Sequence, residues 1–293
     1  MARTVVGLFG PTASGKSAVA RVLAVLVGGE TISADSMQVY DGVPVLTNQS
    51  PARLVAIWPL DFEASVGEYA RLAHAAVDEI LGAGRTPIVV GGTGLYFRAA
   101  LADLDVPPAP PPELRTQVER RYDELGPVDA HALLSDRDPA AAARVHPNDR
   151  RRVVRALELT ELGASLAPAD DRLWTEATRH PTRLFGLDVP PEALAERIRT
   201  RTEEMLDHGA AEEAQAALAR PLSSTAAKIL GLREAAELER DEAVEAIALR
   251  TRQYAAYQRK WMRRIPGLEL VDGTEPPDAV AAAIAARLAE ARE

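Results

Sequence analysis

Residues 10–17 have the types and the spacing of a phosphate-binding loop. They read G-x-x-x-x-G-K-S, a pattern in which the glycines let backbone N–H groups turn toward phosphate oxygens. The lysine adds a positive charge, and the serine hydroxyl can bind Mg²⁺. We therefore expect a phosphate compound at this loop, whose identity the loop alone leaves open. Its members are Gly10, Pro11, Thr12, Ala13, Ser14, Gly15, Lys16 and Ser17.

Asp35 is a candidate for acid–base chemistry beside that loop. It follows a short predicted strand at residues 30–33, and the carboxyl ends of parallel strands line one crevice. Asp35 would then face the phosphate as a general base or as a metal-linked carboxylate. An equally good interpretation is a helix N-cap, because Asp and Ser are favoured at that position.

A second glycine-rich turn, Gly-Gly-Thr-Gly, occupies residues 91–94 after a predicted buried strand at 87–90. Its backbone N–H groups and the Thr93 hydroxyl are candidates for contact with another part of the ligand. The alternative is a tight turn without a ligand. No Asp ends the strand, which counts against an ordinary ATPase.

Arginines gather in two places. The segment 144–155 holds five arginines against one aspartate, in a chain of net charge −9. Such a helix face suits phosphate contacts with a nucleic acid, or is simply a solvated, ion-paired face. Arg197 and Arg201 are four residues apart on a predicted helix, and such a pair can clamp a pyrophosphate.

The bulk composition is that of an ordinary globular protein. Of 293 residues, 47% are apolar and 26% are charged, with no cysteine to form disulfides, bind zinc or act as a nucleophile. No apolar run approaches the roughly 18 residues of a membrane span, and the chain begins directly with a strand. We expect a cytoplasmic protein with no membrane contact.

The order of the predicted elements indicates the fold class. Strands at 4–9, 30–33, 87–90, 183–189 and 268–272 alternate with helices, which predicts an α/β fold. We expect a P-loop NTPase-like parallel sheet flanked by helices, formed by residues 1–106 and 182–293. The proline run 107–112 opens an inserted all-helical subdomain that extends to residue 181.

Several segments together resemble the bacterial tRNA dimethylallyltransferase (tRNA isopentenyltransferase) family. The resemblance extends from about residue 4 to residue 272. The combination of D-S-x-Q-x-Y with G-G-T-G-L-Y is the specific part, because a phosphate-binding loop alone is common. The segments are residues 10–17, Asp35–Tyr40, Gly91–Tyr96, His146–Asp149, Arg155–Glu158 and Thr251–Gln253.

The resemblance implies transfer of a dimethylallyl group from dimethylallyl diphosphate to N6 of the adenine beside the anticodon. It implies that Asp35 accepts the N6 proton, and that Lys16, Ser17 and Arg201 hold pyrophosphate with Mg²⁺. Thr93 would lie where the two substrates meet. The insertion would grip the anticodon stem-loop of tRNA, and the protein would be a monomer. The implied tRNA contacts are Asp35, Ser36, Met37, Gln38, Thr93, Arg115, Arg151, Arg152, Val153, Val154 and Arg155.

Two segments depart from the family pattern. Residues 46–50 and 53–56 replace a G-T-A-K-P segment and a His-His pair, and residues 257–261 depart from K-R-Q-x-T-W. Three other functions remain open: an isopentenyltransferase acting on free adenine nucleotides, a metabolite kinase that uses ATP, and a non-catalytic RNA-binding or GTPase-like regulator.

Overall fold

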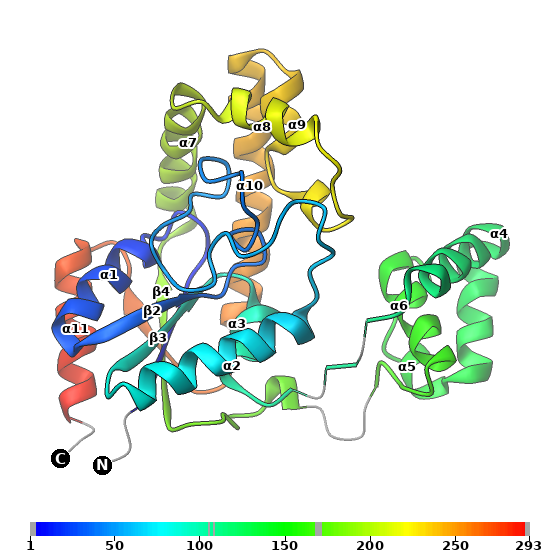
Figure 1. The fold of residues 1–293 in the computed structure, drawn as a ribbon, viewed down its shortest axis with the longest axis horizontal. Coiled ribbons are helices and arrows are strands. Elements are labelled where there is room, and N and C mark those ends of the chain that lie inside the picture. Colours follow the sequence, from blue (N-terminus) through cyan, green and yellow to red (C-terminus); the bar gives the residue numbers. More distant parts are fainter. Residues whose placement is uncertain (1–3, 105, 108, 168–171, 291–293) are drawn as a thin grey trace. The chain divides into compact units, whose positions relative to one another are not determined.

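The computed structural model describes residues 4–104, 106–107, 109–167 and 172–290. The chain forms two compact units, which are described separately below (Figure 1). The larger one comprises Met1–Asp103 and Leu173–Glu293, and the smaller one Leu104–Arg172. Residues 173–181, which we expected in the insertion, belong to the larger unit. In the expected proline linker, Pro108 lies outside the described residues.

The larger unit is built on a five-stranded parallel sheet with the order β2-β3-β1-β4-β5. The predicted fold class is therefore confirmed. The central strand β1 pairs with β3 on one side and β4 on the other, so the carboxyl ends of all three meet at one edge. The strands are β1 (Val5–Phe9), β2 (Gly29–Ser33), β3 (Thr86–Gly91), β4 (Thr182–Asp188) and β5 (Leu268–Asp272).

Helices cover both faces of this sheet because its strands are apolar on both sides. Val6 and Leu8 of β1 pack under α1 (Lys16–Val27) and α11 (Pro277–Glu290). Their neighbours Val5 and Phe9 belong to the core on the opposite face, which is covered by α2 (Val66–Gly82) and α3 (Gly94–Leu101) (Figure 1).

The C-terminal half adds a helical layer beside the sheet. The longest helix there, α10 (Arg240–Met262), packs along α7 (Pro191–Asp207) through Ile198, Ala248 and Ala255. In the described part of the chain, no helix is long and apolar enough to cross a membrane. The remaining elements of this layer are α8 (Ala210–Leu218), α9 (Leu232–Glu237) and a short 3₁₀ turn at Ala226–Lys228. A second 3₁₀ turn, Arg172–Trp174, lies where the chain passes from the smaller unit to the larger one.

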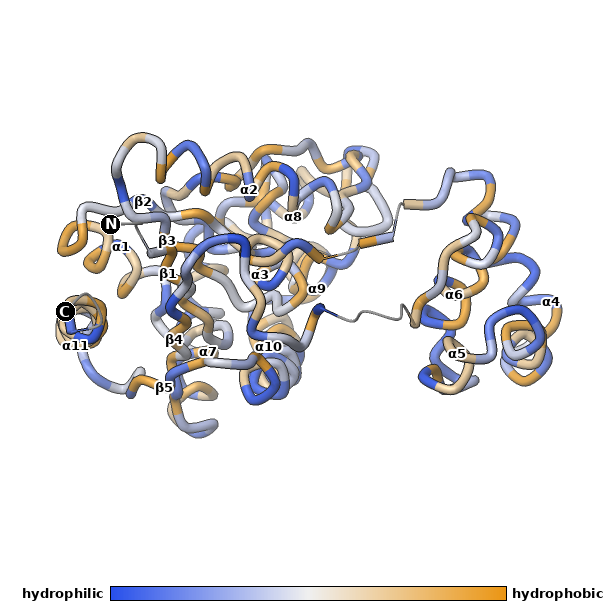
Figure 2. Tube along the Cα trace, turned by 90° about the horizontal axis from the view of Figure 1, so that it is seen from below, coloured by the Kyte–Doolittle hydropathy of each residue, from blue (hydrophilic) through white to orange (hydrophobic). Residues whose placement is uncertain are grey.

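The smaller unit consists of α4 (Pro112–Arg137), α5 (Pro139–Ala142) and α6 (Arg150–Glu161). Gly126, with φ 75°, and Pro127 kink α4. Each helix carries both hydrophobic and hydrophilic residues (Figure 2), and the hydrophobic ones form a separate core.

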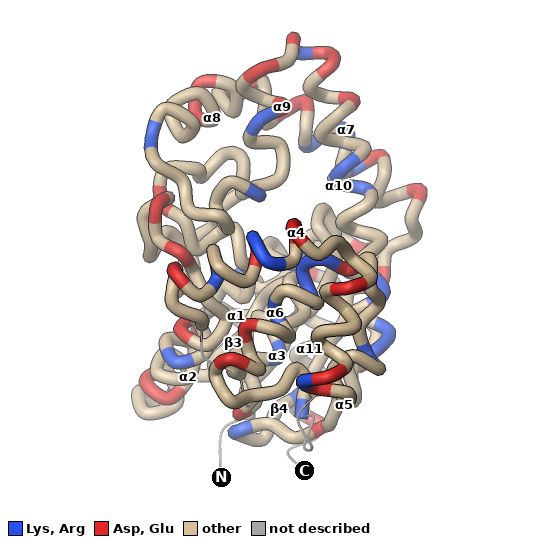
Figure 3. The backbone as a smooth tube through the Cα atoms, turned by 90° about the vertical axis from the view of Figure 1, so that its right-hand side faces the viewer, with Lys and Arg blue, Asp and Glu red and all other residues tan. Residues whose placement is uncertain are grey.

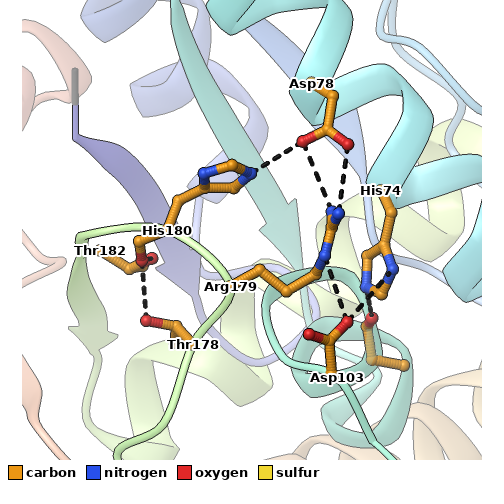
Figure 4. Close-up of polar contacts among 8 residues, drawn as sticks. His74, Asp78, Asp103, Thr178, Arg179, His180 and Thr182 are labelled. Carbon is orange, nitrogen blue, oxygen red and sulfur yellow. Dashed lines mark hydrogen bonds and ion pairs between the residues drawn. The ribbon is translucent and has the colours of Figure 1, made fainter. Parts of the chain in front are cut away.

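Polar side chains attach the returning segment 173–182 to α2 and α3 (Figure 4). Asp78 on α2 accepts hydrogen bonds from His180 at 2.7 Å and from Arg179 at 3.2 Å, and Arg179 also pairs with Asp103 at 3.2 Å. The buried Arg98 donates to the carbonyl oxygens of residues 173, 175 and 177. These contacts explain why 173–181 belongs to the larger unit.

Candidate active site

The phosphate-binding loop connects β1 to α1, as its sequence predicts. Ala13 and Gly15 have positive φ values of 62° and 88°, and Gly15 begins α1 in the left-handed region. Alternation of this kind turns successive N–H groups toward one side, where they meet the positive end of the helix dipole. The loop therefore has the backbone conformation of an anion site.

Asp35 lies just beyond β2, where it caps a turn rather than a helix. Its Oδ1 accepts a hydrogen bond from the Met37 N–H at 2.9 Å, which stabilises the turn that follows. Within the described residues Oδ2 has no hydrogen-bond partner. Asp35 also lines a small pocket with Lys16 and Ser17, so one oxygen serves the turn and the other remains available for chemistry.

Two cations share this site with Asp35. Burial lowers the pKa of Lys16 from 10.5 to about 8, although Asp35 raises it, and the neighbouring Arg201 lowers it further. Burial also lowers the pKa of Arg201, and Asp35 again acts in the opposite direction. Arg201 donates to Thr12 Oγ1 at 3.1 Å, so α7 brings its charge to the loop.

Arg197 does not join Arg201 at the loop, so the sequence-based clamp is wrong for this residue. Its guanidinium donates to the carbonyl oxygen of Gly273 at 3.1 Å, on the segment that follows β5. A spacing of four residues places two side chains on one side of a helix, but it does not decide what each one meets.

The irregular segment 41–64 supplies one wall of the pocket. Residues 50–52 line it together with Arg21 and Gln38. The Gln38 amide is fully engaged: it accepts from Ser33 Oγ at 2.8 Å and donates to the carbonyls of Thr47 and Asn48. Gln38 thus holds residues 47 and 48 of this segment in place. A tRNA contact through the Gln38 amide nitrogen would require these bonds to break.

The glycines of the second turn are required by close packing, and a ligand contact of their backbone N–H groups stays a prediction. A Cβ on Gly91 would lie 2.2 Å from the Ala34 carbonyl oxygen, and one on Gly94 would lie 2.1 Å from the Trp261 ring. The Thr93 hydroxyl, by contrast, does lie at the site. It is 3.3 Å from the Ser36 N–H and 3.4 Å from Ser36 Oγ, next to Asp35.

Two arginines of the smaller unit pair with Glu158. This carboxylate is buried and pairs with Arg115 at 3.4 Å and with Arg155 at 3.1 Å. Arg151 and Arg152 are exposed, and charges of both signs occur on the helices of the smaller unit (Figure 3). On α6 the four arginines precede the two glutamates.

Val153 and Val154 pack in the core of the smaller unit, with exposures of 0% and 5%. Their side chains are therefore not available for the tRNA contact that the resemblance implies. They fix the orientation of α6, whose flanking arginines remain at the surface.

Sequence reasoning missed two residues of α10. Gln258 is buried, and its Oε1 accepts the N–H of Thr12 at 2.7 Å, across 246 positions of the chain. Tyr254 reaches Thr93 with its hydroxyl at 3.3 Å. Their spacing of four residues, followed by Trp261 three residues later, marks them as one helix face. Gln258 and Trp261 also keep the spacing of Gln and Trp in the family pattern K-R-Q-x-T-W.

Hard oxygen ligands for Mg²⁺ are present but few. Among the described residues no group of three or more His, Cys, Asp or Glu side chains is placed to hold a metal. The Ser17 hydroxyl and the Asp35 carboxylate line the same pocket. This sparse set fits Mg²⁺, which commonly keeps several waters and binds substrate phosphates with one or two protein ligands.

A parallel sheet with a phosphate-binding loop on its central strand, and a carboxylate facing that loop, defines an α/β protein of the P-loop class. Comparison with known proteins narrows the class. The sequence model of IPP transferase matches residues 38–265. This chain belongs to that family, the tRNA dimethylallyltransferases.

Individual relatives agree with this assignment. The tRNA dimethylallyltransferase of Salinispora arenicola is 40% identical, and the alignment covers 92% of this chain and 83% of the relative. A tRNA isopentenylpyrophosphate transferase from Bacillus halodurans has a similar structure, with a TM-score of 0.70 and 29% identity over 98% of this chain and 96% of the other. The structure of a eukaryotic dimethylallyltransferase acting on tRNA is similar with a TM-score of 0.80 and 25% identity. That match covers 97% of this chain and 77% of the other.

Proposed function

We propose that this protein transfers a dimethylallyl group from dimethylallyl diphosphate to N6 of the adenine adjacent to the anticodon in tRNA. One observation carries the proposal: Lys16 and Asp35 line one pocket at the phosphate-binding loop, and Arg201 donates a hydrogen bond to Thr12 of the same loop. Two cations and an anion-binding loop suit a departing pyrophosphate, and a carboxylate beside them suits an incoming amine. The names of the relatives support the same reaction.

Departure of pyrophosphate is the first chemical problem. The bond between C1 of the allyl group and the diphosphate oxygen breaks, and its electron pair leaves with pyrophosphate. Negative charge then grows at the loop, where the Lys16 ammonium would stabilise it, and Arg201 adds a second positive charge through its position at Thr12. Preorganised donors of this kind stabilise a transition state more than a ground state. No ATP is consumed.

Removal of the N6 proton is the second problem. The exocyclic nitrogen of adenine is a weak nucleophile, and it loses a proton as the bond from N6 to C1 forms. Oδ2 of Asp35 is the acceptor, because Oδ1 is engaged with the Met37 N–H. The adenine has to leave its stack to reach this carboxylate. Thr93, beside Ser36, contacts the substrates where they meet.

Ser17 would hold Mg²⁺ together with the diphosphate, which leaves Oδ2 of Asp35 for the proton. The ion supplies additional positive charge at the leaving group when it is bound. The smaller unit, with Arg115, Arg151 and Arg152, would bind the phosphates of the anticodon stem-loop. The protein would act as a monomer.

A transfer assay tests the proposal. Purified protein and Mg²⁺ are mixed with dimethylallyl diphosphate and unmodified tRNA, and the mass of the tRNA is measured by mass spectrometry. We expect a gain of one dimethylallyl group on tRNA and none on AMP in a parallel reaction. Transfer to AMP alone would indicate the nucleotide enzyme, and ATP consumption without transfer would indicate a kinase.

The Asp35→Asn variant tests the base. We expect turnover to fall by about 10²–10⁴-fold, the usual contribution of a general base, while inorganic pyrophosphate still binds. The assay should run near pH 7, below the pKa of Lys16, because Asp35 helps to keep Lys16 charged. Asp41→Asn is the matched control, since the one side-chain contact of Asp41 within the described part of the chain is with the adjacent Gly42 N–H. Near-normal turnover of Asp35→Asn would remove Asp35 from the mechanism.

A further inference from the structure

One face of α10 contacts both turns that form the site. Tyr254, Gln258 and Trp261 follow one another at intervals of four and three residues, so their side chains leave the helix on the same side. Tyr254 Oη lies 3.3 Å from Thr93 Oγ1, and Gln258 Oε1 accepts the Thr12 N–H at 2.7 Å. Trp261 packs against Gly94.

The turn at residues 91–94 lies so close to α10 that it has no room for side chains at two of its glycines. A Cβ on Gly92 would lie 2.3 Å from the Gln258 amide nitrogen and 2.7 Å from the Gly10 carbonyl oxygen. The Gly10 N–H also donates to the Gly91 carbonyl at 3.2 Å, so the two turns are bonded directly as well. The phosphate-binding loop, the second turn and α10 therefore form one tightly packed assembly.

The hydrogen bonds of Thr93 in this assembly are not those of an ordinary helix cap. It occupies the cap position of α3, where a threonine hydroxyl normally accepts a backbone N–H of the first turn, but it makes no such bond. Its hydroxyl oxygen instead accepts the Ser36 N–H, at 3.3 Å, and lies within reach of Tyr254. Burial raises the pKa of the Tyr254 hydroxyl well above its ordinary value, so this group stays protonated and able to donate.

We propose that Tyr254 is a positioning residue for the transfer reaction. By donating to Thr93, it holds Thr93 and, through the Ser36 N–H, the turn that carries Asp35. Gln258 holds the phosphate-binding loop from the next turn of the same helix. One rigid helix thereby sets the spacing between the proposed base and the proposed leaving-group site, and the inference rests on the proposed function. Catalytic groups tolerate errors of only about 0.5 Å, so such a brace affects the chemical step.

The test removes one oxygen atom. Tyr254→Phe keeps the ring and loses only the hydroxyl. Tyr257→Phe is the matched control, because it makes the same change on the same helix at a side chain that is 54% exposed. We expect kcat to fall roughly tenfold in Tyr254→Phe, the loss of about one hydrogen bond. The KM for dimethylallyl diphosphate, the affinity for inorganic pyrophosphate and the melting temperature should match those of the control.

A double-mutant cycle with Thr93→Val asks whether Tyr254 acts through Thr93. If it does, Tyr254→Phe costs nothing further once the Thr93 hydroxyl is absent. Additive losses, or an unchanged kcat in Tyr254→Phe, would overturn the proposal. A fall in pyrophosphate affinity and melting temperature in step with kcat would also overturn it, because the residue would then be structural.

Hydrogen exchange separates failure of this inference from failure of the proposed function. It requires no activity, so it remains informative if the protein does not modify tRNA. We expect the Ser36 amide to exchange faster in Tyr254→Phe than in Tyr257→Phe. Equal rates would refute the brace whatever the reaction is.

Discussion

Lys16 combines two properties that oppose each other. It must be charged to bind pyrophosphate, yet burial and Arg201 bring its pKa down to about 8. Asp35 partly offsets the effect of burial. A lysine in this state is charged at neutral pH with little margin, so its charge depends on what occupies the site.

This balance predicts a pH-dependent affinity for inorganic pyrophosphate. A bound anion raises the pKa of Lys16, so pyrophosphate binds most tightly when Lys16 is already charged, below pH 8. Above pH 8 the affinity for pyrophosphate falls by up to about tenfold per pH unit. Titration calorimetry between about pH 7 and pH 9.5 measures it. Lys16→Arg keeps its charge over this range and corrects for the titration of pyrophosphate itself. The same pH slope in both proteins would contradict the prediction.

At the scale of elements, α6 shows how a buried carboxylate organises a basic surface. Glu158 lies between Arg115 of α4 and Arg155 of its own helix. Reversing Arg155 would bring two carboxylates together at a buried position and disturb the fold. Arg151 is exposed and forms no ion pair among the described residues, so its substitution tests binding without disturbing the fold.

We expect Arg151→Glu to weaken tRNA binding several-fold and to lower the salt dependence of binding by about one phosphate contact. The affinity for inorganic pyrophosphate should not change. Arg71→Glu on α2 is the control, because it changes the net charge equally at an exposed arginine of the larger unit. Equal losses of tRNA affinity in Arg151→Glu and Arg71→Glu would show a general charge effect and would contradict a tRNA contact at α6.

At the scale of the whole molecule, the chain returns to the sheet through a polar cluster on α2. His74 donates to the Ala99 carbonyl at 2.8 Å and lies near Arg179. Burial, and then Arg179, lower the pKa of His74 below 6.5. Burial would raise the pKa of Asp78, but hydrogen bonds from His180 and Arg179 lower it below 3.8.

Both shifts make the fold sensitive to acid. His74 binds a proton more readily in the unfolded chain than in the folded one, so the free energy of unfolding falls as the pH drops through 6.5. Asp78 contributes through its negative charge, and its contribution to the free energy of unfolding is lost only below about pH 4. His74→Gln keeps a donor for Ala99 and should flatten the decline in melting temperature between about pH 7 and pH 5 by a few degrees. His208→Gln, at the exposed end of α7, is the control. An unchanged decline would assign the acid sensitivity to other groups.

The sequence by itself determined the parts of this protein whose physics is local. The conformation of residues 10–17 follows from two glycines and a lysine at fixed spacing, and the strand–loop–helix order follows from short apolar runs. Asp35 could be placed at the same sheet edge because parallel strands end together. These inferences use only neighbours along the chain and one rule of topology.

Tertiary structure alone decided which distant residues complete the site. Arg197 and Arg201 look equivalent in sequence, yet one meets Gly273 and the other Thr12. The Gly-Gly-Thr-Gly turn resembles a ligand cradle, yet its glycines make room for Ala34, Gln258 and Trp261. The reason is physical: each outcome depends on packing between segments far apart in the chain, and no local preference of either segment encodes the contact.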